Sequence, residues 1–112
     1  MVNVPRPTRW FSKRQEQQVA KNLGGKVNLN SGAAPFCAGD VVKDDFLIEC
    51  KTVTKSSSSF SIKKAMLKKV EQEAFEMGKD NFALAFNFGP DEKCYYVITE
   101  KTMQNLIQIL RN

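Results

Sequence analysis

The chain of 112 residues contains no histidine. This absence excludes Ser-His and Cys-His pairs for nucleophilic catalysis and removes the commonest ligands of zinc. The three cysteines, Cys37, Cys50 and Cys94, lie far apart and form no C-x-x-C pair, which disfavours a zinc knuckle or a redox pair. An enzyme of this composition would have to work with carboxylates, lysine and a metal ion that prefers oxygen ligands.

Long apolar runs are absent as well. No stretch approaches the length of a membrane span, and the first residues, MVNVPRPTRWF, lack the apolar core of a signal peptide. We therefore expect a cytoplasmic protein with reduced cysteines, in which Cys50 packs in the core.

Positive charge is in excess, with a formal net charge of +5 and a pI of about 9.2. A small basic domain suggests a polyanionic partner, most simply nucleic acid. The apolar fraction of 42% is enough for one core. The sequence thus predicts a single domain over residues 1–112, in which residues 1–9 form a basic N-terminal arm.

The pattern of apolar residues predicts three helices and five strands. Helices are expected up to Leu23, between the cap Ser61 and Gly78, and from about Thr99 onward. Strands are expected over residues 26–30, 40–42, 46–53, 81–89 and 94–99. The order α-β-β-β-α-β-β-α indicates an α/β fold with a mixed sheet flanked by helices. In the last helix, the apolar side chains that we expect to face the core are Met103, Leu106, Ile107 and Leu110.

The stretch FLIECKT carries two charges, Glu49 and Lys51, on one face of a strand that otherwise looks buried. A charge is costly to bury unless it is paired or bound. If the preceding hairpin turns at Asp44-Asp45, residue numbers across it sum to 89, and Asp40 lies opposite Glu49. Two carboxylates in that position repel each other and destabilise the sheet unless a cation lies between them.

Such a pair predicts a Mg²⁺ site, because Mg²⁺ prefers hard oxygen ligands. Asp40 and Glu49 would hold the ion, with the backbone carbonyl of Cys50 as a third oxygen. Lys51 would orient an attacking water or stabilise charge on a phosphate. An E-x-K alone is also common on ordinary surface strands, where it forms cross-strand ion pairs. The acid opposite Glu49 and the basic chain favour the catalytic interpretation.

The segment AGDVVKDDFLIECKT resembles the core of the PD-(D/E)XK nuclease superfamily, in which an acid opens one strand and (D/E)-x-K follows on the next. These residues would be Asp40, Glu49 and Lys51. The wider layout is similar to the archaeal and phage-type Holliday junction resolvase branch. There Glu16 matches an acid on the first helix, and Ser31, in NSGA, matches a serine near the scissile phosphate. Gly39 stands where the superfamily pattern has proline.

This resemblance implies a restriction-endonuclease-like fold and a Mg²⁺- or Mn²⁺-dependent endonuclease acting in DNA recombination or repair. Glu16 would be an outer ligand of the metal or of a water. The resolvase branch further implies a homodimer that cuts branched DNA, and the small size suits a phage or compact microbial enzyme, cytoplasmic in its host. Two alternatives remain. One is a different nuclease of the superfamily, of nicking, repair or restriction type, and the other is a basic DNA-binding domain without activity.

Basic residues suggest where DNA would lie. The N-terminal arm surrounds Trp10 and Phe11 with cations, and basic residues with aromatics suit phosphate contacts and stacking. A disordered tail whose aromatics fill the core or a dimer seam is an equal alternative, and a solvated helix face would explain the lysines further along the chain. The expected DNA-binding residues are Arg6, Arg9, Lys13, Arg14, Ser31, Lys55, Lys63 and Lys64.

Overall fold

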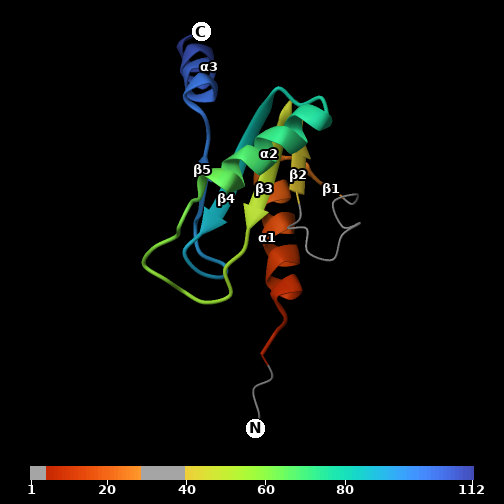
Figure 1. The fold of residues 1–112 in the computed structure, drawn as a ribbon, viewed down its shortest axis with the longest axis vertical. Coiled ribbons are helices and arrows are strands. Elements are labelled where there is room, and N and C mark those ends of the chain that lie inside the picture. Colours follow the sequence, from red (N-terminus) through yellow and green to blue (C-terminus); the bar gives the residue numbers. More distant parts are fainter. Residues whose placement is uncertain (1–4, 29–39) are drawn as a thin grey trace.

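A computed structural model describes residues 5–28 and 40–112 of the chain. Its elements are α1 (Thr8–Leu23), β1 (Lys26–Asn28), β2 (Asp40–Lys43), β3 (Phe46–Lys51), α2 (Lys64–Glu76), β4 (Asn81–Asn87), β5 (Cys94–Val97) and α3 (Glu100–Arg111) (Figure 1). They form a mixed α/β fold, as the sequence predicts. None of the helices described is long and apolar enough to cross a membrane.

The sheet has five strands in the order β1-β2-β3-β4-β5. Only β3 and β4 run parallel, and the other neighbours are antiparallel. A parallel pair needs a long crossover connection, and α2 supplies it. The segment from β3 through α2 to β4 thus places a helix directly over the two central strands.

Two helices cover opposite faces of this sheet. Alternation along β3 sends Ile48 and Cys50 to the core under α1, whereas Leu47 packs with Val70 and Ala74 of α2. Because Glu49 and Lys51 share the alternation of Leu47, both belong to the α2 face. Burial raises the pKa of the Cys50 thiol, which suits the predicted core position.

The hairpin between β2 and β3 has the predicted register. Its strands pair Lys43 with Phe46 and Asp40 with Glu49. The turn uses Asp44 with a φ of 51°, a left-handed conformation that Asp tolerates well. Two contacts fix the turn against the start of β4. Lys79 Nζ donates a hydrogen bond of 2.6 Å to the backbone carbonyl of Asp44, and the backbone N–H of Asn81 donates one of 2.9 Å to the backbone carbonyl of Asp45.

The helix ends differ from prediction in one case. A left-handed Gly24, with a φ of 69°, ends α1 after Leu23, as expected. Ser61 does not cap α2, because the backbone remains extended through Lys63 and the helix begins at Lys64. Ile62 therefore precedes the helix and is exposed instead of belonging to its buried stripe.

The prediction that α3 turns its apolar side into the core is wrong. Figure 1 shows α3 beyond the end of the sheet, away from α1 and α2. Its only buried residue is Thr102, whose hydroxyl donates a hydrogen bond to Asn81 Oδ1 over 3.4 Å. The four side chains expected to face inward are exposed: Met103, Leu106, Ile107 and Leu110. α1 and α2 already cover the two faces of the central strands, which leaves this helix on its own.

Candidate metal centre

The hairpin places two buried carboxylates directly opposite each other. Asp40 is 6% exposed and Glu49 is 1% exposed, and they pair across β2 and β3. Both point to the α2 face of the sheet, where the helix shields them from water. One oxygen of each lies within 4.8 Å of the other. At an effective dielectric constant near 20, two ionised carboxylates at that separation repel by about 3 kcal/mol or more. The fold therefore keeps an arrangement that costs stability unless a cation compensates it.

A third carboxylate, Glu73 of α2, completes the group. One ligand oxygen from each of Asp40, Glu49 and Glu73 can be chosen so that all three lie within 4.8 Å of one another. Among residues 5–28 and 40–112, the donor atoms of this group are all carboxylate oxygens. Such a set suits a hard cation such as Mg²⁺ or Mn²⁺ and is a poor match for metals that prefer thiolate or imidazole.

Two oxygens of this group are buried without a hydrogen bond. Within residues 5–28 and 40–112, Asp40 Oδ1 and Glu49 Oε2 have no donor partner. Buried polar atoms in folded proteins are almost always satisfied, because leaving one unpaired costs about 1 to 3 kcal/mol and more for a charged group. A divalent cation between the carboxylates would satisfy both oxygens, so the residues present fit such an ion.

Two lysines contact the acidic group from its rim. Lys69 Nζ lies 3.4 Å from Glu49 Oε1 and 3.8 Å from Glu73 Oε1, and Lys51 Nζ lies 3.7 Å from Glu49 Oε1. The side chain of Lys51 is 25% exposed and that of Lys69 is 50% exposed, against 1% for Glu49. The lysines therefore lie between the buried acids and the solvent, where an approaching phosphate would meet them first.

The acids also change one another's protonation. Burial, followed by the charges of Glu73 and Glu49, raises the pKa of Asp40 to about 7, while Lys69 opposes the rise. Burial, followed by the charge of Glu49, raises the pKa of Glu73 as well. Near neutral pH the group thus binds a proton readily when no metal is bound, and a metal ion would compete with that proton.

Glu16 lies outside this group of ligand atoms. It is on α1, 9% exposed, and burial raises the pKa of its carboxyl. Its charge nevertheless contributes to the raised pKa of Asp40, so the two residues influence each other electrostatically. The proposed roles of Glu16 and of the Cys50 carbonyl stay predictions. Ser31 lies outside the described residues.

The expected DNA-binding residues are spread over two parts of the surface. Five of them are exposed with no ion pair inside the described chain: Arg9, Lys13, Lys55, Lys63 and Lys64. Arg6 is stacked over the Trp10 ring, 4.1 Å from its centroid, and the Phe11 ring meets Trp10 edge to face at 4.9 Å. Arg14 forms an ion pair with Asp91, which reduces its availability to a phosphate.

Sequence reasoning missed the contribution of α2 to the site. Lys69 and Glu73 are four residues apart and therefore share one side of the helix. Each directly precedes a residue of the buried stripe, Val70 and Ala74, so the pair borders the face that packs on the sheet. That position indicates that the two side chains lie near the sheet. It assigns them to the acidic group only if the strand that the helix crosses is known.

Glu73→Gln is expected to weaken Mn²⁺ binding by about tenfold, because the loss of one carboxylate from the surroundings of a hard cation typically lowers its affinity by about that factor. Isothermal titration of Mn²⁺ into the protein without DNA measures the dissociation constant. Glu71→Gln is the matched control, since Glu71 lies on the same helix but contacts Lys68 instead of the acidic group. Equal Mn²⁺ affinity in the two variants would remove Glu73 from the ligand set.

Comparison of the chain with models of protein families, with curated proteins and with solved structures found no match. The chemistry of the acids and lysines is therefore the basis on which a function can be assigned. That chemistry is a cluster of three carboxylates that could hold a cation, with two ammonium groups beside it.

Proposed function

We propose that this protein is a metal-dependent DNA endonuclease with the restriction-endonuclease-like fold of the PD-(D/E)XK superfamily, and most specifically a Holliday junction resolvase. One observation carries the proposal: two buried acids face each other across a hairpin, one oxygen of each has no hydrogen-bond partner in the described residues, and Lys51 contacts the other oxygen of Glu49. A domain that only binds DNA gains nothing from three carboxylates near a phosphate.

The residues divide the work of phosphodiester hydrolysis. Asp40, Glu49 and Glu73 would hold Mg²⁺ or Mn²⁺, which when bound activates the attacking water and stabilises the charge that develops on the phosphate. Lys51 orients the water and keeps a positive charge next to the reacting phosphate. Lys69 neutralises Glu49 and Glu73 in the free protein and is placed to contact a phosphate oxygen once the metal takes over that role.

The burial of Glu49 restricts how DNA approaches. Because α2 covers the acids, the sugar-phosphate backbone of the DNA would reach them past Lys51 and Lys69, at the end of β3. The exposed cations at the start of α1 and before α2 are then the natural contacts for flanking phosphates. The homodimer implied by the resolvase likeness belongs to this proposal, since a dimer would cut two strands of a junction.

A nuclease assay tests the proposal. We expect cleavage of a synthetic four-way junction in the presence of Mg²⁺ or Mn²⁺, none in EDTA, and at least about tenfold slower cleavage of a linear duplex of the same sequence. Labelled strands resolved on denaturing gels give the rates and the cut positions. A flap substrate run in parallel separates a resolvase from other nucleases of the superfamily.

Two results would contradict the proposal at different levels. Equal cleavage of junction, flap and duplex would retain a nuclease but reject the resolvase. Junction binding that is independent of metal, with no cleavage in either ion, would instead identify a DNA-binding domain without activity.

A further inference from the structure

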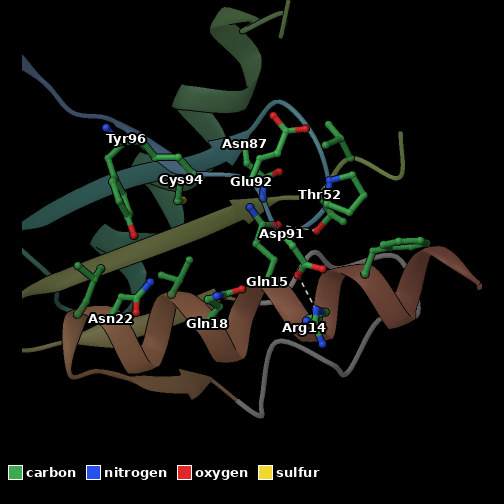
Figure 2. Close-up of a pocket in the computed structure, with 16 residues that line it drawn as sticks. Arg14, Gln15, Gln18, Asn22, Thr52, Asn87, Asp91, Glu92, Cys94 and Tyr96 are labelled. Carbon is green, nitrogen blue, oxygen red and sulfur yellow. Dashed lines mark hydrogen bonds and ion pairs between the residues drawn. The ribbon is translucent and has the colours of Figure 1, made fainter. Parts of the chain in front are cut away.

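A second concave site lies on the opposite face of the sheet from the acids. It is a cavity of about 390 Å³ between α1 and the ends of β3, β4 and β5. Figure 2 shows Gln15, Gln18 and Asn22 along α1, facing Thr52, Asn87 and Tyr96. This volume is within the range of about 300 to 1,000 Å³ that is usual for small-molecule sites.

Four amide side chains belong to its polar lining. Gln15 is 7% exposed, and its Oε1 accepts a hydrogen bond of 2.7 Å from the Thr52 hydroxyl. Its Nε2 is buried with no acceptor in the described chain. The side chains of Gln18, Asn22 and Asn87 likewise form no hydrogen bond within the described residues. The cavity thus offers an unsatisfied buried donor and several amides able both to donate and to accept.

The charges around the cavity disfavour an anion. Arg14 is held by Asp91 at the rim, where Figure 2 marks their contact, and the Glu92 carboxylate accepts a hydrogen bond from Ser56. The other cation of the lining, Lys93, lies 5.7 Å from the centre of the Tyr95 ring. A phosphate would therefore meet two carboxylates against one compensated guanidinium and one ammonium group. A neutral, planar ligand with donors and acceptors suits the site better.

The apolar part of the lining favours a ring. Phe11, Val19, Val53 and Pro90 contribute aromatic and aliphatic surface beside the amides. Aromatic side chains stack on nucleobases, and Asn or Gln amides pair with base edges through paired donors and acceptors. Among ligands that a DNA-cleaving protein meets, a nucleobase combines these properties.

Residues of the cavity are sequence neighbours of residues that the metal-dependent proposal uses. Gln15 precedes Glu16 on α1, and Thr52 follows Lys51 directly after β3. Lys51 faces the acids under α2, whereas Gln15 and Thr52 open into the cavity on the α1 side. A strand passing the end of β3 would therefore have the acids on one side and the cavity on the other.

We propose that this cavity binds one unpaired nucleobase of the DNA strand held at the acidic site. The inference rests on the proposed nuclease function for the identity of the strand, but its binding chemistry depends only on the cavity. An unpaired base is available next to the crossover of a junction, where extruding it costs less than in a continuous duplex.

The decisive experiment is a binding cycle between the DNA and the protein, run without metal so that no cleavage occurs. Four-way junctions carrying a single abasic residue at successive positions are compared with the intact junction by fluorescence anisotropy. For the unmodified protein we expect the affinity to fall about tenfold at one position near the crossover. For Gln15→Leu and for Gln18→Leu the same abasic residue should cost less than twofold.

Gln17→Leu is the matched control, because Gln17 is an exposed glutamine of the same helix outside the cavity. It should keep the tenfold loss. Gln18 is exposed, so its variant reports on the cavity even if Gln15→Leu fails to fold. An equal abasic penalty in Gln18→Leu and Gln17→Leu, or none at any position in the unmodified protein, overturns the proposal.

A second arm asks whether the base must belong to a strand. Free nucleosides and ribose 5-phosphate are titrated while the side-chain amide signal of Gln15 is followed by NMR. A shift with a nucleoside and none with ribose 5-phosphate supports base binding. Nucleoside binding without any abasic effect would mean a site for free nucleosides, which contradicts the proposal. Since neither arm depends on cleavage, a chain that binds the base but never cuts junctions refutes the nuclease function alone.

Discussion

Asp40→Asn and Glu49→Gln are expected to lower single-turnover cleavage of a junction in Mg²⁺ by about 10³-fold, while junction affinity measured without metal stays within about twofold. Each substitution keeps the shape of the side chain and removes a negative charge from the cation site. A 10³-fold slower rate corresponds to an activation free energy raised by about 4 kcal/mol. We expect a loss of this size when the stabilisation that a metal ion gives to the reaction is removed. Affinity is retained because the lysines and arginines that meet the phosphates are untouched.

Asp45→Asn is the control for this pair of variants. Asp45 lies in the exposed turn, two residues after the end of β2, and outside the acidic group. Asp45→Asn therefore makes the same chemical change as Asp40→Asn without altering the site. It should cut at the rate of the unmodified protein. If Asp40→Asn matches that rate at saturating Mg²⁺, the metal centre is in the wrong place.

The same Asp40→Asn variant should be more stable than the unmodified protein at pH 8 when metal is removed, by up to a few kcal/mol in the free energy of unfolding. The pKa of Asp40 is about 7 in the folded state, against an ordinary value of 3.8. Between these two values the folded state binds more protons than the unfolded state, so raising the pH removes stability. Well below pH 3.8 the carboxyl is protonated in both states and the penalty vanishes.

Urea denaturation in EDTA at intervals from pH 4 to pH 8 measures this effect. The difference between the two proteins should be smallest at pH 4, widen up to about pH 7 and level off above it. Added Mg²⁺ should narrow the difference at pH 8, because an ion that binds only the folded state stabilises it. A difference that stays constant across the pH range would show that Asp40 is not the group whose burial costs stability.

The hairpin half of the site was predictable because strand geometry is periodic. A two-residue turn at Asp44-Asp45 fixes which residues face each other, and the alternation of side chains fixes the face. The position of Asp40 opposite Glu49 follows from the sequence by counting, and the structure confirms it. The same periodicity explains why the acids share a face with Lys51.

The helical half was not predictable in the same way. Whether Glu73 reaches Glu49 depends on where α2 crosses the sheet, which is set by packing of Val70 and Ala74 against Leu47. Sequence spacing places Lys69 and Glu73 on one side of the helix but not over a particular strand. For that reason the sequence predicts the lysines of this helix as DNA contacts or as a solvated helix face, and does not predict a contact with Glu49.

The last helix illustrates a different limit. Its apolar residues recur at helical spacing, which correctly predicts a helix with one apolar side. The pattern does not specify what covers that side. Here the sheet faces above the central strands are already occupied by α1 and α2, and Leu110 remains 85% exposed.

The turn of the β2–β3 hairpin has a consequence for how this sequence can change over time. Insertion or deletion of one residue between Asp40 and Glu49 would shift the pairing by one and turn a carboxylate to the α1 side of the sheet. Substitutions between the two acids leave that count intact. The number of residues in the turn is therefore under as strict a constraint as the acids themselves, even though the turn is exposed and lies outside the acidic group.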